Sequence, residues 1–564
     1  MPGWLGGAVV AAMSLAALPA AAQRAPDAGT LMRDLGQPAP PNPTRPAPEV
    51  PAEAPHVPRQ GPTLTVREFH IRATLFPEET LKALLAGYVG RPVTLGELDE
   101  AAVKIGRYYR EHDLSARAYL PPQTISDGIV EIVVLEAILG GVTARTSNQA
   151  RLDGELAAGI AADRAEIGQP LHPSELQEGV AILNEVPGVA AAAVLRPGAT
   201  PGQTVADISL ADRPWLSGWA QADNDGVKAS GERRATASLA LDDLLGRGER
   251  LSFLAAKTAD SSYGRVALQM PVGYSGLSLG IDGSGLTYSL EGPFSVLGEK
   301  GTAYTIGATA AYPVRRTPSF SLSAYGSFDY KRLVTEATAG TINDRIVIAG
   351  TAGLSASFSD DWFGGGAADA LGGAVTAGDL DRSPNAADLA ADQATARSNG
   401  LYAKLSFNAS RIQPLADGVS LALLANGQAS ISNLDSSEQF SLGGPTGVRA
   451  YPVNEANGDD GLIATVEPRW MALDRLQLSA FYDIGVIRQH VRPYPGSQTV
   501  PGQPNAYPLQ GAGAGIDWAP LPEIELKAVY ARAIGTNAGH DAAGDNSDGK
   551  RDRNALWLQA RVAF

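Results

Sequence analysis

The chain has 564 residues and no cysteine, and its 45 basic and 60 acidic residues give a formal net charge of −15. The absence of cysteine excludes disulfides and thiol chemistry, and the negative charge disfavours a nucleic-acid partner. After residue 22, no uninterrupted apolar run reaches the roughly 18 residues that a membrane helix needs, so any membrane insertion must use strands.

Residues 1–22 have the pattern of a secretory signal peptide. An apolar stretch from Leu5 to Leu18 is followed by Pro19 and three alanines, which are typical of a cleavage site. No Lys or Arg precedes the apolar stretch, in contrast to most signals, and a short buried helix is the alternative. The signal predicts export in a Gram-negative cell.

Residues 23–62 are predicted to form a short helix and a proline-rich linker. Thr30–Leu35 favours a helical turn, whereas residues 36–62 hold ten prolines, which excludes packing as helix or sheet. In the polyproline II conformation, at ~3.1 Å per residue, this linker would span roughly 80 Å. We expect it to act as a tether.

Residues 63–138, the first module, predict a small α+β domain. Val66–Ile71 favours a strand and Pro77–Ala86 a helix, and a capping box from Thr94 to Glu97 opens a second helix. Two strands, at 115–120 and 129–135, complete a β-α-α-β-β order.

Residues 139–215, the second module, repeat this order. The segment GRPVTLGELDEA (90–101) aligns with GQPLHPSELQEG (168–179) at a constant offset of 78 residues. Val189–Leu195 and Val205–Leu210 then supply the second strand pair. Two similar domains in tandem are therefore predicted.

Residues 216–564 consist of segments of about ten residues with alternating polarity, which predict a transmembrane antiparallel β-barrel. Short turns at 245–248, 274–276, 315–318, 413–418 and 520–523 alternate with longer loops that include 434–460, 488–507 and 535–554. We place sixteen strands, near residues 216, 233, 250, 263, 277, 303, 319, 345, 366, 400, 418, 461, 475, 508, 523 and 555. The even number puts all long loops on the face opposite the modules.

The last strand is strongly amphipathic. Residues 556, 558, 560, 562 and 564 are apolar and share one face, while Trp557, Gln559 and Arg561 share the other. The chain ends on this strand with an aromatic residue, Phe564.

The Gly-rich connection from Glu438 to Gly461 carries one arginine, Arg449. In the strand that follows, even-numbered residues from Leu476 to Val486 are apolar, and Asp483 lies on the opposite, interior face. If the loop folds into the barrel, the two charges at ~4 Å attract by about 4 kcal/mol gross, of which a wet lumen would leave ~1 kcal/mol or less. The alternative is a surface arginine and a solvated aspartate.

Six stretches share a family pattern: ARAYLPPQ (116–123), DNDG (223–226), DDLLGRGERL (242–251), NGQAS...SSEQFSLGG (426–444), VRAY (448–451) and FYDIG (481–485). In this order, over about residues 60–564, they resemble the outer-membrane transporters of two-partner secretion, of the haemolysin and filamentous-haemagglutinin type.

The resemblance implies a loop latch, formed by Val448, Arg449 and Tyr451. It implies a partner motif in the barrel wall, formed by Phe481, Asp483 and Gly485. Ala450 stands where the family signature has glycine. If this position requires a left-handed backbone, alanine costs ~1 to 2 kcal/mol there.

The resemblance also implies that both modules are POTRA domains in the periplasm, which bind an extended polypeptide by adding it as a strand to an open sheet edge. We expect this substrate-binding edge on the second strand of the first module, with ordinary packing as the alternative. Its residues are Ser115, Ala116, Arg117, Ala118, Tyr119 and Leu120.

The implied partners are a large secreted exoprotein such as a haemolysin or adhesin, the outer-membrane lipid, and the barrel-assembly machinery, which would read Phe564 as its signal. Some members of the family also activate a cytolysin, and the sequence leaves activation open. In the family an N-terminal helix plugs the barrel, but residues 30–35 are short for this role. No cofactor is implied, and transport would draw energy from cargo folding outside.

Other functions have weaker support. The six histidines lack ligand spacing, no G-x-S-x-G element is present, and QGAGAGIDW (510–518) lacks the Lys of a phosphate loop. We therefore expect no metal site and no enzyme activity. An insertase of the barrel-assembly type usually carries more modules, and a passive porin needs none.

Overall fold

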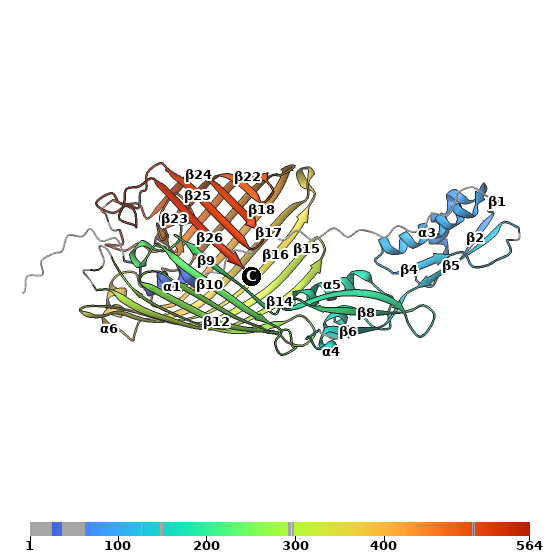
Figure 1. The fold of residues 1–564 in the computed structure, drawn as a ribbon, viewed down its shortest axis with the longest axis horizontal. Helices are drawn as coiled ribbons and strands as arrows, with labels where there is room; N and C mark the ends of the chain where they lie inside the picture. The colour runs from blue at the N-terminus through green and yellow to red at the C-terminus, as the bar shows by residue number, and fades with distance from the viewer. Residues whose placement is uncertain are drawn as a thin grey trace, which may run out of the picture.

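The computed structural model describes residues 25–36, 62–125, 127–146, 150–291, 295, 298–498, 500 and 502–564. The predicted signal peptide and most of the proline-rich linker lie outside these residues. Figure 1 shows a barrel at one end of the molecule, the second module against its rim, and the first module at the far end.

The first module folds around a three-stranded sheet in the order β2-β5-β4, with β2 parallel and β4 antiparallel to β5. The predicted capping box is confirmed, since Thr94 accepts the Glu97 backbone N–H and Glu97 accepts that of Thr94. Its elements are β1 (Thr63–Thr65), β2 (Glu68–Arg72), α2 (Glu78–Leu84), η1 (Ala86–Tyr88), β3 (Pro92–Thr94), α3 (Leu95–Glu111), β4 (Ala116–Tyr119) and β5 (Ile129–Glu136).

The second module has the same plan, with the strand order β6-β8-β7 and the same parallel and antiparallel pairings. The predicted strand pair corresponds to β7 and β8. Its elements are β6 (Ile138–Thr146), α4 (Gly154–Ala162), α5 (Pro173–Glu185), β7 (Val189–Pro197) and β8 (Gln203–Asp212).

The described residues from Leu216 onward form a closed barrel of sixteen antiparallel strands, which confirms the predicted fold class. Each strand begins within five residues of its predicted position. The strands are β9 (Leu216–Asp223), β10 (Arg234–Asp242), β11 (Arg250–Lys257), β12 (Ser261–Pro271), β13 (Ser278–Ser289), β14 (Lys300–Thr317), β15 (Phe320–Ala337), β16 (Gly340–Asp360), β17 (Ala367–Asp381), β18 (Gly400–Ala416), β19 (Val419–Ser430), β22 (Asp460–Leu473), β23 (Leu476–Arg488), β24 (Ala506–Leu521), β25 (Ile524–Ile534) and β26 (Asn554–Ala563).

Shorter elements lie in the connections and inside the barrel. They are α1 (Ala28–Gly36), η2 (Lys228–Ser230), η4 (Trp362–Gly364), α6 (Ala386–Ala394), β20 (Phe440–Ser441) and β21 (Asn457–Gly458). Among the described residues, no helix has the length and apolar character needed to cross a membrane.

Three predicted turns are wrong in extent. β14 continues to Thr317, β18 to Ala416 and β24 to Leu521, so the turns at 315–318, 413–418 and 520–523 are tighter than expected. At the first of them the reason is tertiary: Arg316 is buried and donates to the Leu322 carbonyl of β15 at 2.7 Å. Such contacts prolong a strand beyond its apolar band.

The second module docks on the barrel through the β14 terminus. Glu178 of α5 is buried, accepts from Arg315 Nη1 at 2.9 Å, and also accepts the Arg316 backbone N–H at 2.9 Å. Glu185 pairs with the Arg316 guanidinium, and Arg164 donates to the Pro313 carbonyl at 2.8 Å. These charge-assisted bonds fix the module against the rim.

Replacing Glu178 by alanine is expected to loosen this docking, because the buried Arg316 N–H loses its acceptor at a cost of about 1 to 3 kcal/mol. Spin labels on cysteines introduced at Ile167 and Leu245, both exposed, should report a broader distance distribution in the variant. Glu166→Ala, at an exposed position of the same module, is the control and should leave the distribution narrow. Equal distributions in both variants would contradict the docking role.

Candidate functional site

The connection between β19 and β22, residues 431–459, turns back into the barrel, and we call it the internal loop. Its strands β20 and β21 pair as a small hairpin, and the Val448 N–H donates to the Leu442 carbonyl at 2.7 Å. Leu442, Val448 and Tyr451 are buried against wall residues from β23, β24 and β25. The loop tip is therefore a packed part of the barrel interior.

Arg449 meets Asp483 of β23 in a two-pronged ion pair. Its Nε and Nη2 donate to the two carboxylate oxygens at 2.9 and 2.8 Å, and its backbone N–H adds a third bond at 3.1 Å. The guanidinium carbon lies 3.4 Å from the centre of the Phe481 ring. This geometry combines a bidentate fork with a cation–π contact, which a lysine cannot reproduce.

One further acid and one hydroxyl complete the site around this pair. Glu467 of β22 accepts from Arg449 Nη1 at 2.7 Å and from Arg469 at 2.8 Å, while the Thr465 hydroxyl donates to Asp483 at 2.8 Å. Neither Glu467 nor Thr465 was predicted from the sequence. Their interior parity in β22 was the available signal, but parity does not reveal which interior residues meet.

The expectation that this pair is exposed to a wet lumen is wrong. The Asp483 side chain is 0% exposed and that of Arg449 is 12% exposed, because the loop tip packs over them. Solvent screening is therefore small, and removing one partner would leave a buried uncompensated charge, which typically costs about 3 to 5 kcal/mol.

Two wall glycines allow the loop to approach so closely. A Cβ on Gly485 would lie 2.9 Å from Leu442 and 3.0 Å from Val448, and one on Gly511 would lie 2.5 Å from the Ala450 Cβ. Gly485 of the predicted partner motif thus serves close packing. Gly511 belongs to the QGAGAGIDW stretch.

Ala450 does not carry the strain considered from the sequence. The left-handed residues of the internal loop are Asn454 and Ala456 among the non-glycines, and Ala450 is not one of them. Alanine is compatible with this backbone, and its methyl group fills the space above Gly511.

Helix α1 lies inside the barrel, where the family resemblance implies a plug helix (Figure 1). Ala28, Leu31 and Met32 are buried against wall residues, while Arg33 donates to the Ser436 and Gln439 carbonyls at 3.1 and 2.9 Å. The short helix therefore fastens to the wall by its apolar face and to the internal loop by its cation.

A second buried ion pair holds the base of the internal loop. Glu438 accepts from Lys331 at 2.7 Å and lies 2.9 Å from the Lys404 ammonium. Burial raises the pKa of Glu438, but the two ammonium groups lower it more, and the net pKa is about 2.

The predicted capture edge lies far from the latch, in the first module (Figure 1). Ala116, Arg117, Ala118 and Tyr119 form β4, which pairs with β5 on one side and ends the sheet on the other. Ser115 instead joins the modules, donating to the Leu171 carbonyl at 3.0 Å, and Leu120 lies beyond the strand.

Phe564 follows the C-terminal end of β26 and lies beside the first residues of β9. Its N–H donates to the Gly218 carbonyl at 2.9 Å, and its side chain is exposed. Within the described residues, no three His, Cys, Asp or Glu side chains group as a metal site.

Acid should weaken the hold on the internal loop. Because the folded pKa of Glu438 lies below its ordinary value of 4.5, its stabilisation is present above pH ~4.5 and is lost as the pH falls towards about 2, a change of at most about 3 kcal/mol. The midpoint of the heat-induced shift in electrophoretic mobility, measured against pH, should fall over this range in the wild type. Glu438→Gln should start lower and vary less; parallel curves would contradict this assignment.

Comparison with known proteins agrees with the geometry. The family described as haemolysin secretion/activation protein ShlB/FhaC/HecB matches residues 202–517, and the ShlB-type POTRA domain matches residues 64–137. The chain is 27% identical over 497 residues to the heme/hemopexin transporter protein HuxB of Haemophilus influenzae strain 86-028NP, covering 86% of this chain and 84% of that protein.

Two further relatives share the name CdiB. The outer membrane transporter CdiB of Dickeya dadantii strain 3937 is 25% identical over 440 residues, or 73% of each chain. The solved structure of CdiB from Escherichia coli has a TM-score of 0.66 at 18% identity and covers 92% of this chain and 94% of that one. Because the family match covers more than half of the chain, this protein belongs to the ShlB/FhaC/HecB family of haemolysin secretion/activation proteins, the outer-membrane transporters of two-partner secretion, with its POTRA modules in the periplasm.

Proposed function

We propose that this transporter captures its exoprotein as an extended chain on β4 of the first module and passes it through the barrel under the control of the Arg449 latch. The cargo is a large exoprotein of the haemolysin or adhesin type. The observation that carries the proposal is the bidentate pair between Arg449 and Asp483, buried between the internal loop and the barrel wall.

The ion pair between Arg449 and Asp483 suits a loop that must be held in one position and also be released. Arg449 bonds to three wall side chains: Glu467 on β22, Asp483 on β23 and Trp557 on β26. Its own backbone contributes only two of these bonds, from its N–H to Asp483 and from Trp557 to its carbonyl. Such a contact fixes one position of the loop without the many ladder bonds that hold a strand. Cargo that displaces the loop can therefore break these bonds one at a time.

Passage requires that α1 and the internal loop leave the lumen. Helix α1 is held by separate polar contacts, such as that between Arg33 and Asn454 at 2.7 Å, and by one apolar face. The proline-rich linker gives it a tether of sufficient length. The movement needs no nucleotide, and the energy comes from cargo folding at the cell surface.

The open edge of β4 supports the capture step. The Ser115 carbonyl accepts from Ala137, so alternation along an antiparallel pair directs the N–H groups of Ala116 and Ala118 away from β5. An extended segment can add to these groups through main-chain bonds, which makes capture tolerant of cargo sequence.

The exposed terminal Phe564 on an amphipathic strand is a signal for the barrel-assembly machinery, and the apolar outer face of the strands contacts outer-membrane lipid. The protein is a transporter without enzyme activity of its own.

Arg449→Ala should reduce secretion at least roughly tenfold while leaving a heat-modifiable barrel, because the loop loses about 3 to 5 kcal/mol of buried pairing but the wall keeps its ladder bonds. Secretion is measured as exoprotein in the medium. The control is Arg397→Ala, which removes an exposed arginine from the β17–β18 loop. Normal secretion by Arg449→Ala would reject the latch.

A charge exchange tests the pairing itself. Arg449→Asp combined with Asp483→Arg should secrete more than either single variant, provided that Glu467→Gln is added, because Glu467 would otherwise repel the new aspartate. No recovery in the triple variant, with each barrel assembled, would mean that the two groups do not act as a pair.

Ala118→Pro should weaken cargo capture, because proline lacks the N–H that an added strand would use. Ala118→Ser keeps that N–H and is the matched control. Binding of the purified exoprotein amino-terminal segment to the full-length transporter should fall in the proline variant alone. Equal binding by both variants would remove β4 as the capture edge.

A further inference from the structure

The DNDG motif at 223–226 has no part in the latch, and it lies where the barrel closes. The closing strands β26 and β9 share a register of five residue pairs, from Gln559 with Asp223 to Ala563 with Trp219. Every other neighbouring pair of described barrel strands has eight or more. The first half of β26, Asn554–Leu558, therefore has no strand opposite it on the β9 side.

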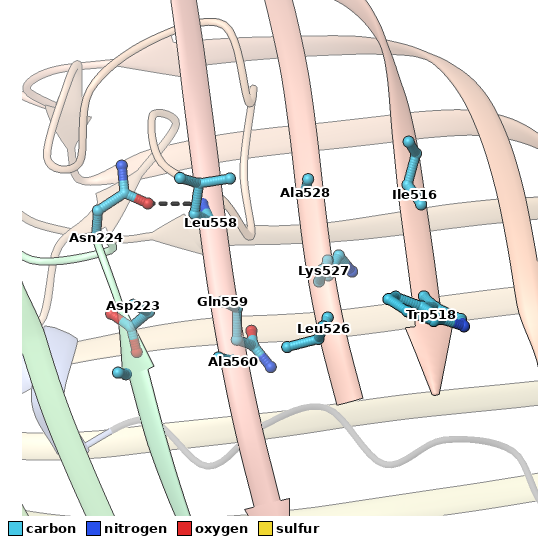
Figure 2. A pocket seen from close by; sticks show the side chains of 11 residues that line it. Asp223, Asn224, Ile516, Trp518, Leu526, Lys527, Ala528, Leu558, Gln559 and Ala560 are labelled. Atoms are coloured by element: carbon cyan, nitrogen blue, oxygen red, sulfur yellow. Dashed lines mark hydrogen bonds between the residues drawn. The ribbon is translucent and has the colours of Figure 1, made fainter. Parts of the chain in front are cut away.

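Asn224 takes the place of the missing strand. Its side-chain Oδ1 accepts the Leu558 N–H at 2.7 Å, and its Nδ2 donates to the Leu556 carbonyl at 2.8 Å, as shown in part in Figure 2. Its backbone N–H adds a bond to the Leu558 carbonyl at 3.3 Å. One primary amide thus reproduces the donor and acceptor of a peptide unit at the end of the seam.

The neighbours of Asn224 hold it in place. Asp223 accepts from Arg234 of β10 and from the Asp225 N–H at 3.0 Å. A Cβ on Gly226 would lie 2.2 Å from the Gly231 carbonyl oxygen, so the turn closes only with glycine there. The four residues of the motif together anchor the turn to β10 and direct its amide at β26.

The outer face beside the seam is hollow. A cavity of about 550 Å³ is lined there by Ala222 of β9 and by Ala560 and Leu558 of β26. Figure 2 shows Leu558 beside Asn224, with Ala528 on the next strand. Larger side chains, such as Trp518, lie farther around the barrel. The part of the seam beside Asn554–Leu558, which we call the upper seam, therefore depends on polar contacts.

On the inner face, the same stretch of β26 is held by the latch. The Trp557 indole Nε1 donates to the Arg449 carbonyl at 2.8 Å. Residues 556–558 are thus held from one side by Asn224 and from the lumen by the loop that carries the latch.

We propose that the latch and the upper seam are coupled. Asn224 holds residues 556–558 of β26 on the β9 side, and Trp557 binds the same stretch to the Arg449 carbonyl of the internal loop. This inference rests on the proposed latch function. When cargo displaces the internal loop, the upper seam loses the bond from Trp557 to the loop. It is then held on the β9 side by Asn224, through its side-chain amide and its backbone N–H. Asn224 and Trp557 are positioning residues of the transporter.

The test measures hydrogen exchange of the Leu558 amide in the full-length protein. Asn224→Ala and Trp557→Phe should each accelerate it roughly tenfold, as expected for the loss of one or two hydrogen bonds, with exchange in β14–β16 unchanged. Asn554→Ala is the control: Asn554 accepts from Tyr530 on the β25 side, so Leu558 should exchange at the wild-type rate.

The coupling is tested by Arg449→Ala in two backgrounds. It should accelerate Leu558 exchange in the wild type but add nothing in Trp557→Phe, because the tie is already absent. No acceleration in the wild type, or an equal factor in both backgrounds, would overturn the proposal even if Arg449→Ala abolishes secretion. Normal secretion with accelerated exchange would instead reject the latch function and leave the coupling in place. The Trp557 arm remains informative if Asn224→Ala fails to assemble.

Discussion

The buried pair of Arg449 and Asp483 is the interaction on which the arrangement of the lumen depends. An ion pair removed from water is retained only if its geometry is good and its remaining donors and acceptors are satisfied. Here the fork to Asp483, the bond to Glu467, the Thr465 hydroxyl and the Phe481 ring meet those needs. The loop tip, the wall glycines and the carbonyl bound by Trp557 all take their places around this pair.

The molecule uses two kinds of connection for two kinds of part. The wall is a continuous ladder of backbone bonds, which resists opening because many bonds must break together. The parts that occupy the lumen or join domains are held by side chains: α1 by Arg33, the internal loop by Arg449 and Glu438, and the second module by Glu178. Such contacts can be broken singly, which suits the proposed displacement of α1 and the internal loop by the exoprotein.

Much of this could be read from periodicity and turn chemistry. Strand parity put Asp483 and Trp557 inside and Tyr482 outside, because alternation in a barrel wall reports directly which face meets lipid. The capping box and the tandem repeat likewise predicted the modules. Parity could not identify Glu467 as the second acceptor of Arg449, because this contact depends on where the internal loop folds against the wall. Nor could it identify Asn224 as a substitute for a peptide unit, because that contact depends on how the first and last strands meet when the ring closes.

The sequence by itself determined the outer-membrane barrel, the two modules, the number and position of the strands, and the pairing of Arg449 with Asp483, since these follow from local periods and from motifs of a few residues. Only the tertiary structure decided that the pair of Arg449 and Asp483 is buried, that α1 lies inside the barrel, that Ala450 is unstrained, and that the seam is short. Burial and closure depend on segments hundreds of residues apart, such as Asn224 and Leu558, and no local pattern specifies how closely they meet.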